Sequence, residues 1–216
     1  MGGISIVLIV VIGINVLFSL KGFNDFSFFE KYKFNIGAIR NGEQVRMVSS
    51  AFLHADTTHL FFNMLTLYFF APLVLSYLGN IKFLVVYSGS LLVGNLLSFT
   101  FHKNEYQYSA VGASGAVSGI IYSGILFQPD MKLYMMFIPI PIPAYLFGIG
   151  YLLFSIYGMK SKLGNIGHDA HFGGAVGGYI LTLLMAPYLL ETNFLIVGLL
   201  AIPIVILFVM KKLGKI

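Results

Sequence analysis

Serine, histidine and asparagine side chains near the starts of three apolar segments could act together in nucleophilic catalysis. Ser114 lies between Gly112 and Gly115, and these small neighbours leave its hydroxyl uncrowded and let another backbone approach. His171 begins a glycine-rich apolar segment farther along the chain. An imidazole within hydrogen-bond reach of a serine hydroxyl can act as general base and later protonate a leaving amine. Ser114 and His171 are therefore candidates for a catalytic dyad.

His59 and Asn63 form a second candidate group. Their i,i+4 spacing places both side chains on one face of a helix. Both side chains can donate hydrogen bonds. Together with the backbone N–H of Ser114, they could stabilise the oxyanion of a tetrahedral intermediate.

Small residues recur at helical spacing on two segments, and they suggest how the serine and histidine could meet. The small residues are Gly115, Gly119 and Ser123 after Ser114, and Gly174 and Gly178 after His171. A lone serine among glycines is more often a packing feature than a nucleophile, because such residues let membrane helices approach closely. If the two stripes pack together, however, the hydroxyl and the imidazole lie at the same depth.

The composition predicts that lipid surrounds most of the chain. Of 216 residues, 58% are hydrophobic and 10% are charged, and the mean hydropathy is +0.88, whereas a soluble domain carries about 25% charged residues. A spanning helix needs about 20 apolar residues. Seven segments qualify or nearly qualify: 4–20, 59–78, 81–101, 113–127, 143–159, 169–189 and 193–210. We expect an all-α polytopic membrane protein that forms one bundle.

The order of these segments places the candidate residues on one side of the membrane. His59 begins the second segment, Ser114 the fourth and His171 the sixth, and even-numbered spans all start on the same side. The fourth segment is short, about 22 Å as a helix against a hydrocarbon core of roughly 30 Å. The polar run 106–113 is therefore expected to descend into the membrane and to place Ser114 in a wet cavity.

The connections between the segments carry further predictions. The stretch 21–58 is charged and rich in phenylalanine, which is typical of an interfacial loop containing a short amphipathic helix. Pro139, Pro141 and Pro143 remove helical donors and predict a break before the fifth helix. The first apolar run lacks the basic start and the small-residue cleavage site of a signal peptide, so it should remain in the mature protein.

Several other kinds of site are not supported by the sequence. With no cysteine there is neither a disulfide nor a thiolate site. His54, His59, His168 and His171 lack an HExxH motif or a carboxylate cluster, so no metal is expected and His54 is assigned a hydrogen-bonding role. Asp169 points to a different helix face from His171, which favours a dyad over a triad. The 13 lysines and arginines are scattered, which favours contact with lipid headgroups over nucleic acid.

Taken together, these motifs resemble those of the rhomboid family of intramembrane serine proteases. The matches are His59-xxx-Asn63, Gly112-Ala113-Ser114-Gly115 and Ala170-His171-xx-Gly174-xxx-Gly178. Arg46, in the long first loop, looks like an arginine that the family carries there. The resemblance runs from about residue 4 to 189.

The resemblance implies a six-helix catalytic core over residues 1–190, with 191–216 as an appended transmembrane helix and basic tail. It also implies cleavage of membrane-embedded protein substrates in or beside their transmembrane segments. Ser114 would be the nucleophile, His171 the base, and His59 and Asn63 the oxyanion donors, with no metal or organic cofactor. The expected location is the cell membrane of a prokaryote, and the oligomeric state is left open.

The chain departs from the family pattern at two positions and in its charge distribution. Ser118 stands where many members have an aromatic that stacks on the histidine, and Val45 precedes Arg46 where a tryptophan is usual. The predicted active-site side carries most of the loop cations, which are Lys21, Lys31, Lys33, Arg40, Arg46, Lys103, Lys160 and Lys162. The positive-inside rule would turn this side toward the cytoplasm, whereas the family orientation turns it outward.

Two other functions stay open. A catalytically silent member of the same fold would bind and escort membrane proteins. A small transporter would use the buried histidines as a proton relay, since intramembrane ionisable groups are functional by default.

Overall fold

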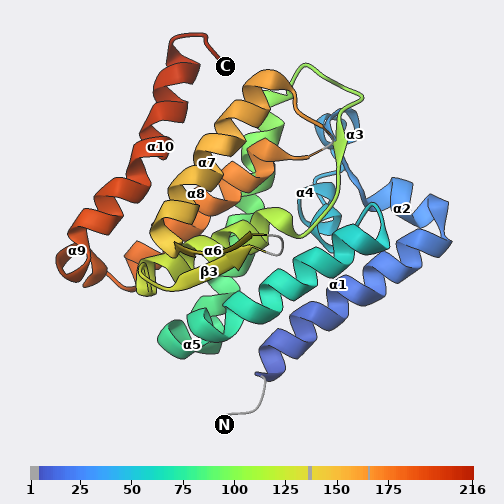
Figure 1. The fold of residues 1–216 in the computed structure, drawn as a ribbon. Coiled ribbons are helices and arrows are strands. Elements are labelled where there is room, and N and C mark those ends of the chain that lie inside the picture. Colours follow the sequence, from blue (N-terminus) through green and yellow to red (C-terminus); the bar gives the residue numbers. More distant parts are fainter. Residues whose placement is uncertain (1–4, 136–137, 165) are drawn as a thin grey trace.

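The protein folds as a helical bundle (Figure 1), and the computed structural model describes residues 5–135, 138–164 and 166–216. Its long helices are α1 (Ile6–Asn24), α5 (Thr57–Phe101), α6 (Ser114–Phe127), α7 (Ala144–Ser161), α8 (His168–Met185) and α10 (Phe194–Lys212). Helices occur where all seven apolar segments were predicted, although residue 4, the first of segment 4–20, lies outside the described residues.

The second and third predicted helices form the continuous element α5, which bends sharply at Gly79. Gly79 has φ +71° and ψ 176°, a conformation that glycine adopts without steric cost. The first half begins at Asp56, whose carboxylate accepts a hydrogen bond from the His59 backbone N–H at 2.7 Å. This cap satisfies one of the free donors at the helix start and fixes the turn that carries His59.

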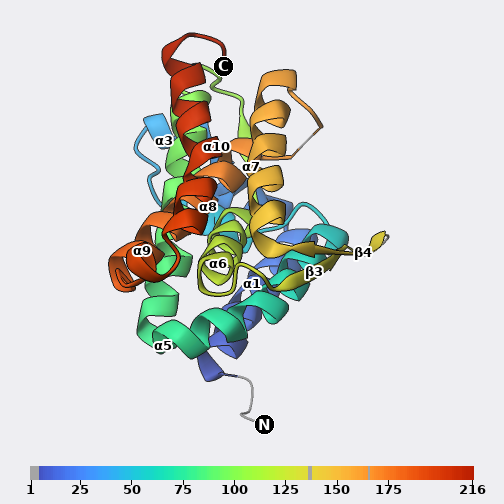
Figure 2. The same ribbon diagram turned by 60° about the vertical axis from the view of Figure 1, so that its left-hand side comes forward.

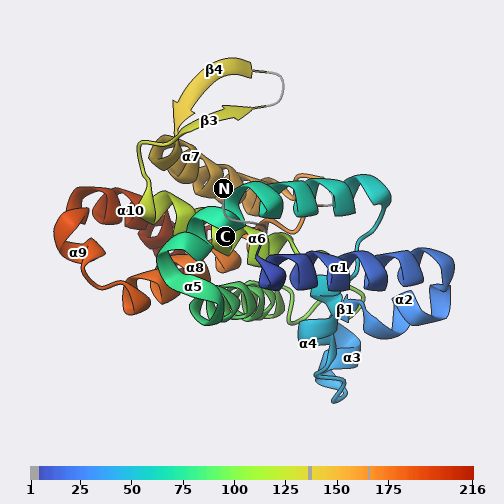
Figure 3. The ribbon, with the colours of Figure 1, turned by 90° about the horizontal axis from the view of Figure 1, so that it is seen from below.

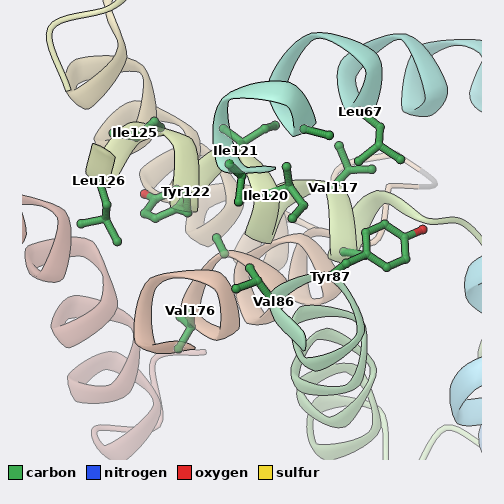
Figure 4. Packing of buried hydrophobic residues seen from close by; sticks show 14 of the residues in the cluster. Leu67, Val86, Tyr87, Val117, Ile120, Ile121, Tyr122, Ile125, Leu126 and Val176 are labelled. Carbon is green, nitrogen blue, oxygen red and sulfur yellow. The ribbon is translucent and has the colours of Figure 1, made fainter. Parts of the chain in front are cut away.

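The centre of the bundle is α6, which packs against α5 and α8. Every residue from 115 to 127 is buried, as expected of a helix that is apolar or small on all sides. Figure 4 shows Ile120 and Val117 of α6 among Val86 of α5 and Val176 of α8. The helix ends at Phe127 and is 14 residues long, about 21 Å at 1.5 Å per residue.

Two small two-stranded sheets accompany the predicted helices. Strand β1 (Phe34–Asn35) pairs with β2 (Ser109–Ala110), and β3 (Lys132–Met135) pairs with β4 (Ile138–Pro143), both antiparallel. The prolines of β4 lie in the predicted break before α7, and their fixed φ also suits an edge strand. The β3–β4 hairpin projects beside α7 (Figure 3).

The long first loop is structured, as its composition predicted. It contains the predicted short helix, α2 (Phe26–Tyr32), followed by α3 (Ile36–Arg40), α4 (Arg46–Ser49) and the 3-10 turn η1 (Ser50–Phe52). Strand β1 anchors this loop to β2, just before α6. The loop is thereby joined to the segment that leads to Ser114.

Among the described helices, α1, α5 and α10 are long and apolar enough to cross a membrane, and α6 is a shorter apolar helix. The short α9 (Leu189–Thr192) leads into α10. Helix α10 packs on α7 through Leu200, which contacts Gly148, and buries Val197 and Leu207. Figure 2 shows α10 standing beside α7 at the edge of the bundle.

Candidate active site

The small stripes of α6 and α8 pack directly against each other. A Cβ added to Gly174 would collide with the carbonyl oxygen of Gly115, and one added to Gly178 would lie 2.5 Å from Cα of Gly119. One turn farther, the Thr182 hydroxyl donates to Ser123 Oγ at 2.7 Å. The close approach predicted from the glycine spacing is therefore confirmed.

This packing brings the starts of the two helices together. A Cβ on Gly115, the residue after Ser114, would lie 3.2 Å from the carbonyl oxygen of Ala170, the residue before His171. Ser114 and His171 are both partly exposed, while Gly115 and Phe172 beside them are buried. Among the hydrogen bonds of the described residues, none joins the Ser114 hydroxyl directly to the His171 ring. The two side chains lie at the same end of an α6–α8 pair in backbone contact.

The orientation of His171 has an explanation that the sequence did not reveal. The ring of Tyr151 from α7 lies 6.1 Å from the His171 ring, centroid to centroid, with 19° between the planes. The Ser118 hydroxyl donates to the Ser114 carbonyl at 2.8 Å and lies 2.7 Å from the Tyr151 hydroxyl. Because the Ser118 hydroxyl proton is donated to the Ser114 carbonyl, the Tyr151 hydroxyl is the donor to Ser118 Oγ. Tyr151 thus supplies, from another helix, the aromatic contact that Ser118 cannot make.

His59 reaches the loop that precedes the serine. A Cβ on Gly112 would lie 2.7 Å from Cε1 and 2.8 Å from Nε2 of His59, and Gly112 has φ +128°. Both the imidazole contact and the backbone conformation therefore require glycine. Asn63 is buried one turn along α5, where its side-chain amide donates to the His59 carbonyl at 3.2 Å.

His54 makes the hydrogen bonds that were expected of it. Its ring is fully buried, with Nδ1 2.8 Å from Ser19 Oγ and Nε2 accepting from the Ala113 N–H at 3.4 Å. Because Nε2 accepts, the proton sits on Nδ1 and is donated to Ser19, which in turn donates to the Phe52 carbonyl. Burial, reinforced by neighbouring His59, lowers the pKa of His54 to about 3. A neutral His54 thus ties α1 to the residue before Ser114.

Arg46 organises the first loop. Its guanidinium bonds the Glu43 carboxylate at 2.8 Å and the carbonyls of Glu30 and Lys33 at 2.7 and 2.9 Å. These contacts join α2 to α4. All the described hydrogen bonds of Arg46 stay within the loop, so they hold this loop together.

Asp169 faces away from His171, as its position on the helix predicted. Its carboxylate lies 3.3 Å from Nε2 of His102, at the end of α5. The described residues contain no group of three histidine, aspartate or glutamate side chains placed to hold a metal ion.

Comparison with known proteins identifies the family of the chain. The rhomboid domain family matches residues 41–188. The chain is 32% identical over 160 residues to "Putative rhomboid protease YdcA" of Bacillus subtilis (strain 168), covering 70% of this chain and 71% of that protein. It is 28% identical over 182 residues to RHOMBOID-like protein 12, mitochondrial, of Arabidopsis thaliana, covering 77% of this chain and 54% of the relative.

A third relative, Rhomboid protease GluP of Bacillus subtilis (strain 168), is 29% identical over 143 residues, covering 65% of this chain and 26% of that protein. The chain thus spans only about half or a quarter of the length of the second and third relatives. The family match covers most of the chain and ends just before α9. The chain is an integral membrane protein of the rhomboid family.

Proposed function

We propose that this protein is an intramembrane serine endopeptidase that cleaves membrane-embedded protein substrates in or next to their transmembrane segments. The observation that supports it best is the backbone contact between Gly115 and Ala170, which holds Ser114 and His171 at one end of neighbouring helices. Named proteases among the relatives, such as GluP, support the same reaction class.

In the proposed reaction, His171 removes the Ser114 proton as Oγ attacks the scissile carbonyl carbon. The carbonyl oxygen becomes an oxyanion, which accepts hydrogen bonds from the His59 ring, the Asn63 amide and the Ser114 backbone N–H. The imidazolium then protonates the leaving amine, and the C–N bond breaks. Water, activated by the same imidazole, hydrolyses the acyl-enzyme and releases the second product.

Tyr151 would position the base in this scheme. A ring that packs on the imidazole restricts its rotation, and the hydroxyl bond to Ser118 links it to the turn that carries the nucleophile. The neutral His54 would fix the other side of the serine loop. Apart from the substrate and the hydrolytic water, these steps use only groups of the chain.

The direct test uses purified full-length protein in liposomes with a generic single-span substrate. Cleavage should occur with the wild type and fall by at least a thousandfold in Ser114→Ala and His171→Ala, since a catalytic dyad acts as a unit. A fluorophosphonate should label Ser114 in the wild type. Wild-type-like cleavage by both variants would refute the assignment. Folded protein that neither cleaves nor is labelled would indicate the silent, substrate-binding alternative.

We also propose a catalytic core over residues 1–190 with α10 as a separate, seventh membrane crossing. The family match ends at residue 188, which supports this boundary. Two of the relatives are bacterial, which supports a prokaryotic cell membrane, while another is mitochondrial. Reporter fusions at 79–81 and 102–108 would decide the orientation, because these connections lie at opposite ends of the second half of α5.

A further inference from the structure

Two adjoining cavities lie where α10 faces α5 and α8, apart from the candidate active site. The first has a volume of about 420 Å³ and is lined by three lysines, Lys160, Lys162 and Lys215, from the ends of α7 and the chain. Phe101 and His102, at the end of α5, complete its inner wall. This cavity lies at the same end of the bundle as His168 and the start of α8.

The second cavity lies next to the first, since Thr100 in its wall is the neighbour of Phe101 in the wall of the first. It has a volume of about 240 Å³, and its walls are mainly apolar, with Leu96 of α5, Val176 of α8 and Phe208 of α10 among them. The Lys211 ammonium, on its rim, lies 4.0 Å above the ring of Phe101 in the first cavity. This cation–π contact marks the boundary between the basic and the apolar space.

The basic cavity has more cations than its own carboxylates can pair. Glu105 and Asp169 also line it, and they lie 3.1 and 3.3 Å from the two ring nitrogens of His102. Burial opposes protonation, but these carboxylates together raise the pKa of His102. None of the ion pairs among the described residues involves the three lining lysines. The two carboxylates and a protonated His102 together leave one negative charge, so the three lysines keep the cavity net positive even when the terminal carboxylate of Ile216 in its wall is counted.

We propose that these cavities bind one anionic phospholipid, with its phosphate among Lys160, Lys162 and Lys215 and one acyl chain in the apolar cavity. The occupant must join an anion to an apolar chain, because the basic and apolar cavities adjoin. Basic pockets between membrane helices bind such headgroups, and lysines at helix ends direct their ammonium groups to the headgroup layer. An acidic peptide would match the charge but would leave the groove lined by Leu96 and Phe208 unfilled.

The site gives α10 a specific role and stands independently of proteolysis. Helix α10 contributes Phe208 and Lys211, and the tail after it contributes Lys215. Asp169 connects the lipid site to α8, two residues before His171. Without a lipid, a space would remain between α5, α8 and α10. An acyl chain can fill this space without breaking any hydrogen bond, because the helices already satisfy their own backbone groups.

The test is a native mass spectrometry titration of the full chain, released from detergent, with dioleoyl phosphatidylglycerol or dioleoyl phosphatidylcholine. We expect phosphatidylglycerol to bind at least tenfold more tightly than phosphatidylcholine. Each lysine near anionic headgroups contributes about fivefold, so Lys160→Gln with Lys215→Gln should weaken phosphatidylglycerol binding about 25-fold and leave phosphatidylcholine unchanged. Leu96→Trp, which narrows the apolar cavity, should weaken phosphatidylglycerol binding without affecting glycerol phosphate.

The matched control replaces Lys31 and Lys132, which lie outside both cavities, with glutamine and should bind phosphatidylglycerol as the wild type does. Thermal unfolding in detergent verifies that each variant is folded. Equal binding of the two lipids, or equal loss in the control pair, would overturn the proposal. The proposal would also be overturned if inorganic phosphate or an acidic peptide, at the same concentration as phosphatidylglycerol, displaced the bound lipid.

Discussion

Adding a single methyl group at Gly178 tests whether backbone contact between α6 and α8 builds the site. In Gly178→Ala the new Cβ would lie 2.5 Å from Cα and 2.6 Å from the carbonyl carbon of Gly119. Carbon atoms in favourable contact lie about 3.5–4.0 Å apart. Because backbone atoms cannot rotate away as a side chain can, the helices must separate by roughly 1 Å.

The magnitude follows from two opposing effects. Overpacking a well-packed interior costs about 1–3 kcal/mol, while replacing glycine by alanine inside a helix returns about 0.5–1 kcal/mol. Gly150→Ala on α7 is the matched control, because nothing lies within 4 Å of its added Cβ and only the favourable effect applies. The favourable effect is common to both variants, so their free energies of unfolding should differ by the overpacking cost alone, about 1–3 kcal/mol.

Unfolding in mixed detergent micelles measures the stability difference, and cleavage of a transmembrane substrate measures the effect on the site. A 1 Å displacement of catalytic groups can cost about a hundredfold in rate, so Gly178→Ala should lose about that much activity while Gly150→Ala retains it. Gly124→Ala, whose Cβ would be 3.4 Å from Phe70, should resemble the control. Equal stability and activity in Gly178→Ala and Gly150→Ala would refute the reasoning.

Three further substitutions test the surrounding contacts. Tyr151→Leu removes the ring beside His171, the proposed base, and aromatic pairs are worth about 0.5–1.5 kcal/mol, so kcat should fall up to about tenfold with KM unchanged. A change in KM alone would contradict this. His54→Leu leaves the buried Ala113 N–H unpaired and should lower the free energy of unfolding by about 1–3 kcal/mol. Unchanged stability would contradict the hydrogen bond between His54 and Ala113. His102 has a raised pKa in the folded protein, so its stabilising contact with Asp169 is complete below the unfolded pKa near 6.5 and is lost as pH rises through the folded pKa. Wild type should thus lose more stability than His102→Gln between pH 6 and 9, and parallel pH profiles would contradict the assignment.

Helical periodicity carried most of what the sequence could predict. The four-residue spacing of Gly115 and Gly119, and of Gly174 and Gly178, specifies a stripe on each helix without any knowledge of the fold. Two such stripes then have few ways to pack closely. The contact between α6 and α8 was therefore predictable, and with it the shared depth of Ser114 and His171.

Contacts between elements with no fixed spacing could not be predicted in the same way. Tyr151 is one of 13 tyrosines, and nothing in its local sequence relates it to a histidine 20 positions later on another helix. Similarly, β1 and β2 are only two residues each, too short for an alternating pattern to be visible. The Tyr151–His171 contact and the β1–β2 pairing both depend on where α7 and the first loop pack against the rest of the bundle.

Asp169 shows both what could and what could not be predicted from the sequence. Helical geometry was enough to predict that its carboxylate points away from His171, because two residues correspond to about 200° around a helix. The partner that it does meet, His102, depends on the sharp bend at Gly79, which sets the course of the second half of α5 beside α8. Local periodicity therefore predicts which contacts a side chain cannot make, while the bend decides which contact it makes, and in this chain that contact borders the cavity where α10 faces the core.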